Sequence, residues 1–155
     1  MTTFDFQDGN GPVPAHQHLN GGGWVADTAK VKLSAYVGPD ALVYGNAEID
    51  GECDIAGNAR VYGHSILSHR ARVLQNAQVY GNAYVTSAVI SGNAEIFGHS
   101  RIFSNSKVYG NAKVCGEAMV FGDSEVAGNV FLDRRAKIGG ACRLFGNLRI
   151  DPYIG

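Results

Sequence analysis

A six-residue repeat constrains this chain more than any other feature of its sequence. Between Val31 and Ile150 an aliphatic residue recurs every six positions, with one residue missing after Val85. All 21 of these positions are Val, Ile or Leu; Ala, Ser or Cys stands two residues before 19 of them, and Gly two residues after 13. Residues two apart in a strand share a face, so the small and the aliphatic residue of each repeat both point inward.

The glycine of each repeat limits the strand before it, because Gly tolerates the positive φ of a sharp corner. Three strands and three corners make a triangular coil of 18 residues, and 21 repeats make seven coils stacked as parallel strands. The sequence therefore predicts an all-β, single-domain parallel β-helix over residues 25–150. Residues 1–24 are expected to form a loop that caps the first coil with Trp24, and residues 151–155 a C-terminal tail.

The repeat resembles that of the hexapeptide-repeat family of left-handed parallel β-helices. The opening His18-Leu-Asn-Gly-Gly-Gly-Trp-Val-Ala-Asp-Thr-Ala29 and the repeats of the form Val-Tyr-Gly-Asn-Ala are similar to those of YdcK-like β-helix proteins. The resemblance implies left-handed coils and a homotrimer. It also implies a bacterial or phage-encoded protein without an assigned chemistry.

Composition excludes several classes of function. A net charge of −1 gives no general reason to bind nucleic acid or an anionic membrane. The first residues show no signal peptide, no stretch is long enough for an apolar membrane span, and three cysteines do not make a disulfide framework. We therefore expect a soluble cytoplasmic protein. Cys53 and Cys142 are expected in the core, and Cys115 is expected to point outward as the one reactive thiol.

Residues 18 apart lie above one another in such a prism, so the sequence can be read as vertical columns. One outward column contains four aromatic residues, Tyr44, Tyr62, Tyr80 and Phe97. A second outward strip, on another face, contains Ile66, Tyr84, Phe103, Met119 and Phe121. Such columns can be ladders of stacked rings, or they can be the centre of an interface. Two uncovered apolar strips favour self-association, with binding of another protein as an alternative.

The corner columns carry the polar side chains. One corner reads Asp40, Asn58, Asn76, Asn93, Asn111, Asn129 and Asn147, which predicts a ladder of amide hydrogen bonds. Another corner places His64 and His99 two coils apart, about 10 Å, so that they cannot share a metal ion. His16 and His18 form a possible but weak metal pair.

These columns leave two classes of function open. The favoured interpretation is a non-enzymatic rigid scaffold or binding module without cofactor or metal, acting through Tyr44, Tyr62, Tyr80, Phe97, Tyr84, Phe103 and Phe121. The alternative is a hexapeptide-repeat acyltransferase that uses acyl-CoA, with His64 or His99 as general base. A zinc site of the γ-carbonic anhydrase type, which needs three histidines contributed across a subunit boundary, is a weaker enzyme hypothesis; His64 and His69 match part of its spacing, and the third histidine, His99, follows that pair. The uninterrupted repeats leave no room for the substrate loop that the acyltransferases carry.

Overall fold

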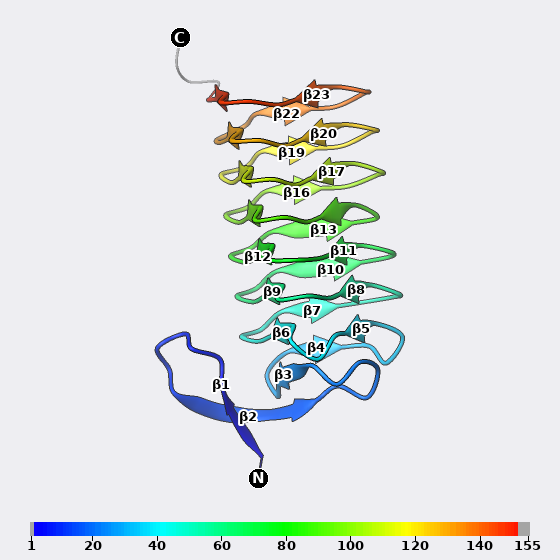
Figure 1. The fold of residues 1–155 in the computed structure, drawn as a ribbon, viewed down its shortest axis with the longest axis vertical. Coiled ribbons are helices and arrows are strands. Elements are labelled where there is room, and N and C mark those ends of the chain that lie inside the picture. Colours follow the sequence, from blue (N-terminus) through cyan, green and yellow to red (C-terminus); the bar gives the residue numbers. More distant parts are fainter. Residues whose placement is uncertain (1, 152–155) are drawn as a thin grey trace.

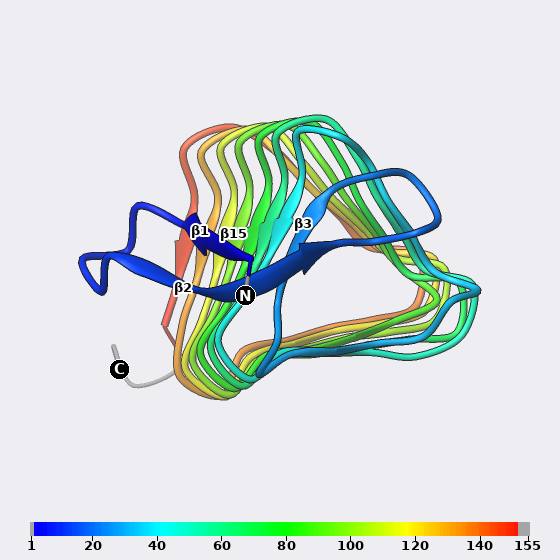
Figure 2. The same ribbon diagram turned by 90° about the horizontal axis from the view of Figure 1, so that it is seen from below.

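The chain folds into a triangular prism of stacked coils, described by a computed structural model over residues 2–151. Figure 1 shows the coils as parallel rows above an N-terminal hairpin, and Figure 2 shows their triangular outline. No helix occurs in the described range, and three sheets form the walls. The predicted all-β solenoid of about seven coils is confirmed. Of the expected tail over residues 151–155, all but Asp151 lies outside the described residues.

Each wall of the prism is one sheet, and we call the three outward surfaces face 1, face 2 and face 3. Face 1 belongs to a ten-stranded sheet, in the order β1 (Thr3–Asp5), β2 (Pro12–Gln17), β3 (Trp24–Ala26), β6 (Leu42–Val43), β9 (Arg60–Val61), β12 (Gln78–Val79), β15 (Glu95–Ile96), β18 (Lys113–Val114), β21 (Phe131–Leu132) and β24 (Arg149–Ile150).

Faces 2 and 3 belong to seven-stranded sheets in which every pairing is parallel. Face 2 contains β4 (Lys30–Val31), β7 (Glu48–Ile49), β10 (Ile66–Ser68), β13 (Tyr84–Thr86), β16 (Arg101–Ile102), β19 (Met119–Val120) and β22 (Lys137–Ile138). Face 3 contains β5 (Tyr36–Val37), β8 (Asp54–Ile55), β11 (Arg72–Val73), β14 (Val89–Ile90), β17 (Lys107–Val108), β20 (Glu125–Val126) and β23 (Arg143–Leu144).

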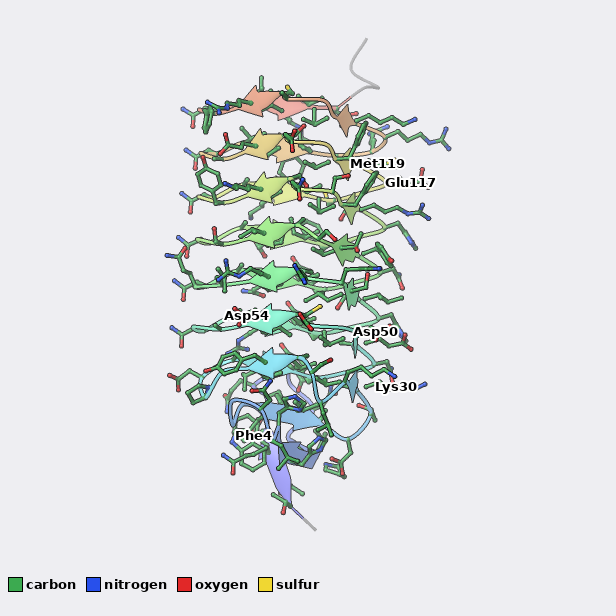
Figure 3. The ribbon with its side chains drawn as sticks, turned by 90° about the vertical axis from the view of Figure 1, so that its right-hand side faces the viewer. Phe4, Lys30, Asp50, Asp54, Glu117 and Met119 are labelled. Atoms are coloured by element: carbon green, nitrogen blue, oxygen red, sulfur yellow. The ribbon has the colours of Figure 1, made fainter. Side chains whose placement is uncertain are left out.

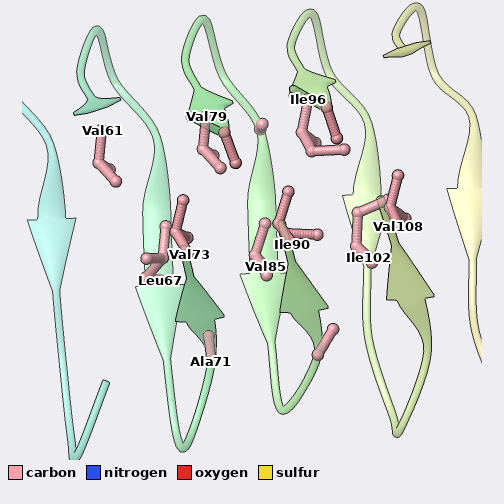
Figure 4. Packing of buried hydrophobic residues seen from close by; sticks show 14 of the residues in the cluster. Val61, Leu67, Ala71, Val73, Val79, Val85, Ile90, Ile96, Ile102 and Val108 are labelled. Atoms are coloured by element: carbon pink, nitrogen blue, oxygen red, sulfur yellow. The ribbon is translucent and has the colours of Figure 1, made fainter. Parts of the chain in front are cut away.

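The repeated aliphatic and small residues form one continuous core along the prism (Figure 4). Val79 and Val85 lie on consecutive strands and Ile102 lies one coil beyond Val85, and all three are fully buried. Serine replaces alanine at four inward positions, and its hydroxyl then donates to the carbonyl three residues earlier, as from Ser65 to Tyr62 at 2.8 Å. No buried side-chain polar atom of the described residues lacks a hydrogen-bond partner.

Corners require a left-handed backbone, and glycine supplies it at most of them. A Cβ added at Gly45, whose φ is +67°, would lie 2.9 Å from the backbone nitrogen of Gly63 in the next coil. His69 and Ser87 occupy equivalent corners with φ of 55°. The one-residue deletion after Val85 falls at the Ser87 corner, and the strands beyond it keep their register. The deletion is therefore a tighter turn and leaves the coils in line.

The N-terminal segment contains strands instead of the expected loop. β1 and β2 form an antiparallel hairpin, and β2 pairs antiparallel with β3, the first strand of the solenoid on face 1. This pairing covers a strand edge that would otherwise be free. Trp24 does not cover the end of the coil as predicted. It points outward from face 1 because it shares its column with Leu42, and Phe4 stacks on it at 4.7 Å.

Candidate interaction surface

The aromatic column predicted on face 1 is a continuous stack of rings. Centroids are 4.7 Å apart for Tyr44 and Tyr62, 4.9 Å for Tyr62 and Tyr80, and 5.0 Å for Tyr80 and Phe97. The planes deviate by only 2° to 3°, because parallel coils repeat the same backbone geometry at each level. The faces of these rings are therefore in contact with one another within the chain.

The polar ends of this stack are also satisfied within the chain. The Tyr62 hydroxyl donates to Oε1 of Gln78 at 2.9 Å, and the Tyr80 hydroxyl donates to Oε1 of Glu95 at 3.0 Å. Burial, with smaller contributions from Tyr44 and Glu95, raises the pKa of Tyr62 to about 12. Burial and the hydrogen bond to Glu95 also raise the pKa of Tyr80 above its ordinary value. Both phenols are neutral hydrogen-bond donors at physiological pH.

Phe6 extends the stack by one ring at the N-terminal end. At this level the column contains Ala26, and the ring of Phe6 packs there, 4.8 Å from the ring of Tyr44. Phe6 is 1% exposed and Tyr44 5%, and the Arg60 guanidinium donates to the Phe6 carbonyl at 3.3 Å. The sequence does not predict this contact of Phe6, because residues 1–24 have no period; the alternation Phe4-Asp5-Phe6 is the available signal of a strand. Tyr44 is thus covered by its own chain.

The apolar strip on face 2 has a different environment. Ile66, Tyr84, Phe103, Met119 and Phe121 are all half-buried and lie on four successive coils, with Met119 and Phe121 on the same coil. The Phe103 and Phe121 rings stack at 5.3 Å, and Phe121 lies over Gly139 of the next coil. A groove of about 630 Å³ runs beside the strip and is bordered by Ile66, Tyr84, Phe103 and Met119, with Arg101 and His99 at its rim. No segment of residues 2–151 covers this strip as Phe6 covers Tyr44.

The three faces differ in whether their outward charged side chains form ion pairs. On faces 1 and 3, residues 18 apart form ion pairs between coils, such as Lys113 with Glu95 at 3.2 Å and Arg143 with Glu125 at 2.9 Å. The outward charges of face 2 form no ion pair with any residue of the range 2–151. These are Lys30, Lys32, Glu48, Asp50, Arg101 and Lys137.

Two further hollows lie along face 2 where these charges stand. One, of about 470 Å³, is lined by Lys30, Lys32, Glu48 and Asp50 on the first two coils. The other, of about 440 Å³, lies on the last three coils and is lined by Arg101, Met119, Lys137 and the corner residues His99, Glu117 and Arg135. Figure 3 shows Lys30, Asp50 and Met119 along the same edge of the prism. Face 2 is therefore an uneven surface with an apolar middle and charged ends.

The predicted catalytic histidines lie on the corner between faces 1 and 2. Both side chains are exposed, and His99 borders two of the hollows of face 2. Neither imidazole has a hydrogen-bond partner among residues 2–151 that would orient it as a general base. His69 lies on another corner, where its Nδ1 is 3.1 Å from the Thr86 hydroxyl. The described residues contain no group of three or more His, Cys, Asp or Glu side chains placed to hold a metal ion.

The N-terminal histidines have separate partners. Nδ1 of His16 is 2.7 Å from a carboxylate oxygen of Asp27, and Nε2 of the buried His18 is 2.9 Å from the carbonyl of Ala35. The two rings therefore have different partners, and the contact of His18 connects the segment between β2 and β3 to the first coil.

Cys115 is not the exposed thiol that the sequence predicts. Its side chain points outward, yet the residue is only 6% exposed because its larger column neighbours, Phe97 and Asp133, enclose it. Burial, together with the hydrogen bond to Asp133, raises the pKa of this thiol to about 11. All three cysteines are free; Cys53 is buried as predicted, and Cys142 is half-buried near the end of the core.

The predicted asparagine ladder is present on the corner between faces 3 and 1. The side-chain amide of Asn111 donates to Asn129 at 3.3 Å, and that of Asn129 donates to Asn147 at 2.7 Å. Asn93 donates to Asn111 and Asn58 to Asn76 in the same way. This corner is therefore explained by bonding between coils.

No protein-family model matches this sequence, and no curated protein matches it either. None of the described elements is a helix that could span a membrane.

Proposed function

We propose that this protein is a non-enzymatic, hexapeptide-repeat β-solenoid of the YdcK-like type that acts as a rigid binding module and self-associates through face 2. The observation that carries the proposal is that the outward charges of this face have no ion-pair partner within residues 2–151. Half-exposed apolar side chains are gathered there with six charges that form no ion pair within residues 2–151, whereas most outward charges of the other two faces, with Arg60 and Lys107 as exceptions, are in ion pairs. All three thiols are free, which supports a cytoplasmic location as part of the proposal.

Rigidity is supported by the way in which the coils are connected. Each strand pairs with its equivalents in the coils above and below, and the same aliphatic core runs through all of them. Side chains on such a surface hold fixed spacings before a partner binds. Binding therefore requires little further ordering of this surface, and the entropic cost of association is small. A preorganised face of this kind suits docking of a second rigid surface.

Face 1 has a supporting role in this proposal. Its stacked rings bond within the chain at both their faces and their hydroxyls, and Tyr44 is covered by Phe6. Tyr62, Tyr80 and Phe97 present only their edges, so they stabilise the stack of coils more than they offer an apolar anchor. Acyl transfer by His64 or His99 finds no comparable support, since neither ring is oriented by a residue in the range 2–151.

Two matched substitutions test the use of face 2. Met119 is half-buried on face 2 and lies in register between Arg101 and Lys137. Val89 is half-buried on face 3 and lies in register between Arg72 and Lys107. A glutamate at either position meets two basic neighbours, so the cost to the fold is similar.

We expect Met119→Glu to convert the assembly to monomer at micromolar concentration, because it places a charge in the apolar middle of the interface. Val89→Glu should leave the assembly intact. Sedimentation velocity measures both, with thermal melting as the check on folding. A wild-type chain that sediments as a monomer, or equal loss of association in both variants, would overturn the proposal.

A further inference from the structure

We infer that face 2 binds a second copy of this chain in antiparallel orientation, with the second coil of one copy opposite the seventh coil of the other. Coils are numbered here by their face 2 strands, from β4 in coil 1 to β22 in coil 7. The inference rests on the proposed self-association and adds its orientation and register. It follows from the order of side chains along a single column.

The geometry of a face-to-face pair decides which side chains meet. A two-fold axis parallel to the strands reverses the order of the coils and keeps the position along each strand. A column therefore meets its own copy in reverse order. Figure 2 shows coils of the same triangular outline, each displaced slightly from the one before, and the in-register pairing of the face 2 strands keeps the side chains of each column on successive coils.

The column concerned is formed by the first residue of each face 2 strand. It reads Lys30, Glu48, Ile66, Tyr84, Arg101, Met119 and Lys137 from coil 1 to coil 7. With coil 2 opposite coil 7, Glu48 meets Lys137 of the second copy, Ile66 meets Met119, and Tyr84 meets Arg101. Two-fold symmetry repeats each pairing, which gives two ion pairs, two apolar pairs and two contacts between a cation and an aromatic ring.

Neighbouring registers place like charges together. With coil 1 opposite coil 7, Lys30 meets Lys137 at both ends of the interface. With coil 3 opposite coil 7, Arg101 lies on the two-fold axis and meets its own copy. Of these three registers, only the one with coil 2 opposite coil 7 joins opposite charges at the ends and opposes no like charges, which are unfavourable. A further shift, with coil 1 opposite coil 6, pairs Glu48 with Arg101. It places Lys30 opposite Met119, however, and leaves Lys137 outside the interface.

A parallel pair of faces is disfavoured for the same reason. A two-fold axis along the prism brings each coil opposite the same coil of the second copy and reverses the position along the strand. Lys30 then meets Lys32, and Glu48 meets Asp50, so both charged coils repel. Within the chain Glu48 lies in register with Lys30 but forms no ion pair with it, so its carboxylate is available to the second copy.

A charge exchange tests the register. Lys137→Glu alone places a glutamate opposite Glu48 twice per dimer, and we expect the dimer dissociation constant to rise roughly tenfold at low salt. Glu48→Lys alone should weaken the dimer similarly. The double variant Glu48→Lys with Lys137→Glu restores opposite charges and should recover most of the wild-type affinity. Lys107→Glu, which reverses an exposed charge on face 3, is the matched control and should have no effect.

A disulfide tests the orientation independently. We expect a mixture of Ile66→Cys and Met119→Cys chains to form a cross-linked dimer on mild oxidation, while each variant alone forms none. Ile66 and Met119 of one chain are three coils apart, about 14 Å, so they cannot bond to each other. The wild-type chain, with its three native cysteines, controls for unrelated disulfides.

The outcomes separate this inference from the proposal beneath it. A monomeric wild-type protein removes both. A second outcome is that Met119→Glu disrupts the dimer, but the double charge variant does not recover its affinity and no mixed disulfide forms. Self-association through face 2 would then stand, and the antiparallel register would be wrong. A trimer by sedimentation equilibrium, as the hexapeptide-repeat resemblance implies, overturns it as well.

Discussion

Faces 1 and 2 are built by the same six-residue repeat over the same core, yet they differ in where their side chains find partners. On face 1 the rings stack from Phe6 to Phe97, and Lys113 is paired with Glu95 one coil away. On face 2 Phe103 and Phe121 form one shorter stack beside a groove, and the outward charges form no ion pair within residues 2–151. The comparison teaches that outward apolar residues are not equivalent. A column that is complete in itself stabilises the coils, and an incomplete one is available to another molecule.

The largest effect should come from the core that both faces share. Val79 lies under face 1 and Val85 under face 2, and both are fully buried. Val79→Asp and Val85→Asp each place an unpaired charge in a dry interior, at a cost of the order of 5 kcal/mol, comparable to the whole stability of a small domain. We expect neither variant to fold, as measured by circular dichroism and solubility. A soluble, native-like variant at either position would contradict the assigned register of the core.

A smaller and more local effect is expected at the N-terminal end of face 1. Phe6→Ala removes a buried ring that holds the hairpin against Tyr44, and a loss of about 3 kcal/mol is typical for truncation of a buried Phe. Hydrogen exchange should become faster in β2 and β3 and stay unchanged in the last coils, because the loss is local. Phe103→Ala on face 2 removes a half-exposed ring and is the control. Equal exchange in the hairpin of both variants would show that Phe6 does not anchor it.

The sequence predicts the repeated part of the molecule well, for a physical reason. Each hexad specifies an inward small residue, an inward aliphatic residue and a corner. A repeat that departs from this pattern therefore does not change the predicted register, because the repeats before and after it specify the same one. The Asn111 to Asn147 ladder and the stacking of Tyr44 on Tyr62 follow from the 18-residue spacing alone. The corner at Ser87 absorbs the missing residue without changing the register.

The parts that the sequence did not predict are set by contacts outside the repeat. Phe6 reaches the column through a hairpin with no period, so nothing in residues 1–24 indicated which ring of face 1 it would cover. Trp24 belongs to a column of face 1 and not to the end of the coil. Cys115 is outward by register but enclosed by Phe97 and Asp133, since exposure depends on the size of the neighbours above and below.

A substitution in the middle of face 1 sharpens the comparison at a smaller magnitude. Tyr62→Ala with Tyr80→Ala interrupts the stack and removes two hydrogen bonds to neighbouring coils, and each ring pair is worth about 1 kcal/mol. We expect a lower melting temperature and an unchanged sedimentation coefficient, because these rings serve the chain itself. Loss of association with an unchanged melting temperature would move the interface from face 2 to face 1.

The smallest effect expected is the contribution of one face 1 phenol, that of Tyr62, to the pH dependence of stability. Burial raises the pKa of Tyr62 to about 12 in the folded chain, against about 10 for an exposed phenol. Between these values the unfolded chain has lost the proton and the folded chain still holds it, so the free energy of unfolding falls as pH rises. This contribution is fully present below pH 10 and is lost as pH rises from there through 12. Solvent contact of the half-buried ring makes the change small.

The measurement is a series of urea denaturations between pH 8.5 and 11.5 on the wild-type chain and on Tyr62→Phe. The phenylalanine keeps the stacked ring and removes the titrating group, so its free energy of unfolding should fall less steeply above pH 10 than that of the wild type. At pH 8.5 the two chains should differ only by the lost hydrogen bond to Gln78, about 1 kcal/mol. Parallel curves for the two chains would show that Tyr62 ionises equally well in the folded and unfolded states.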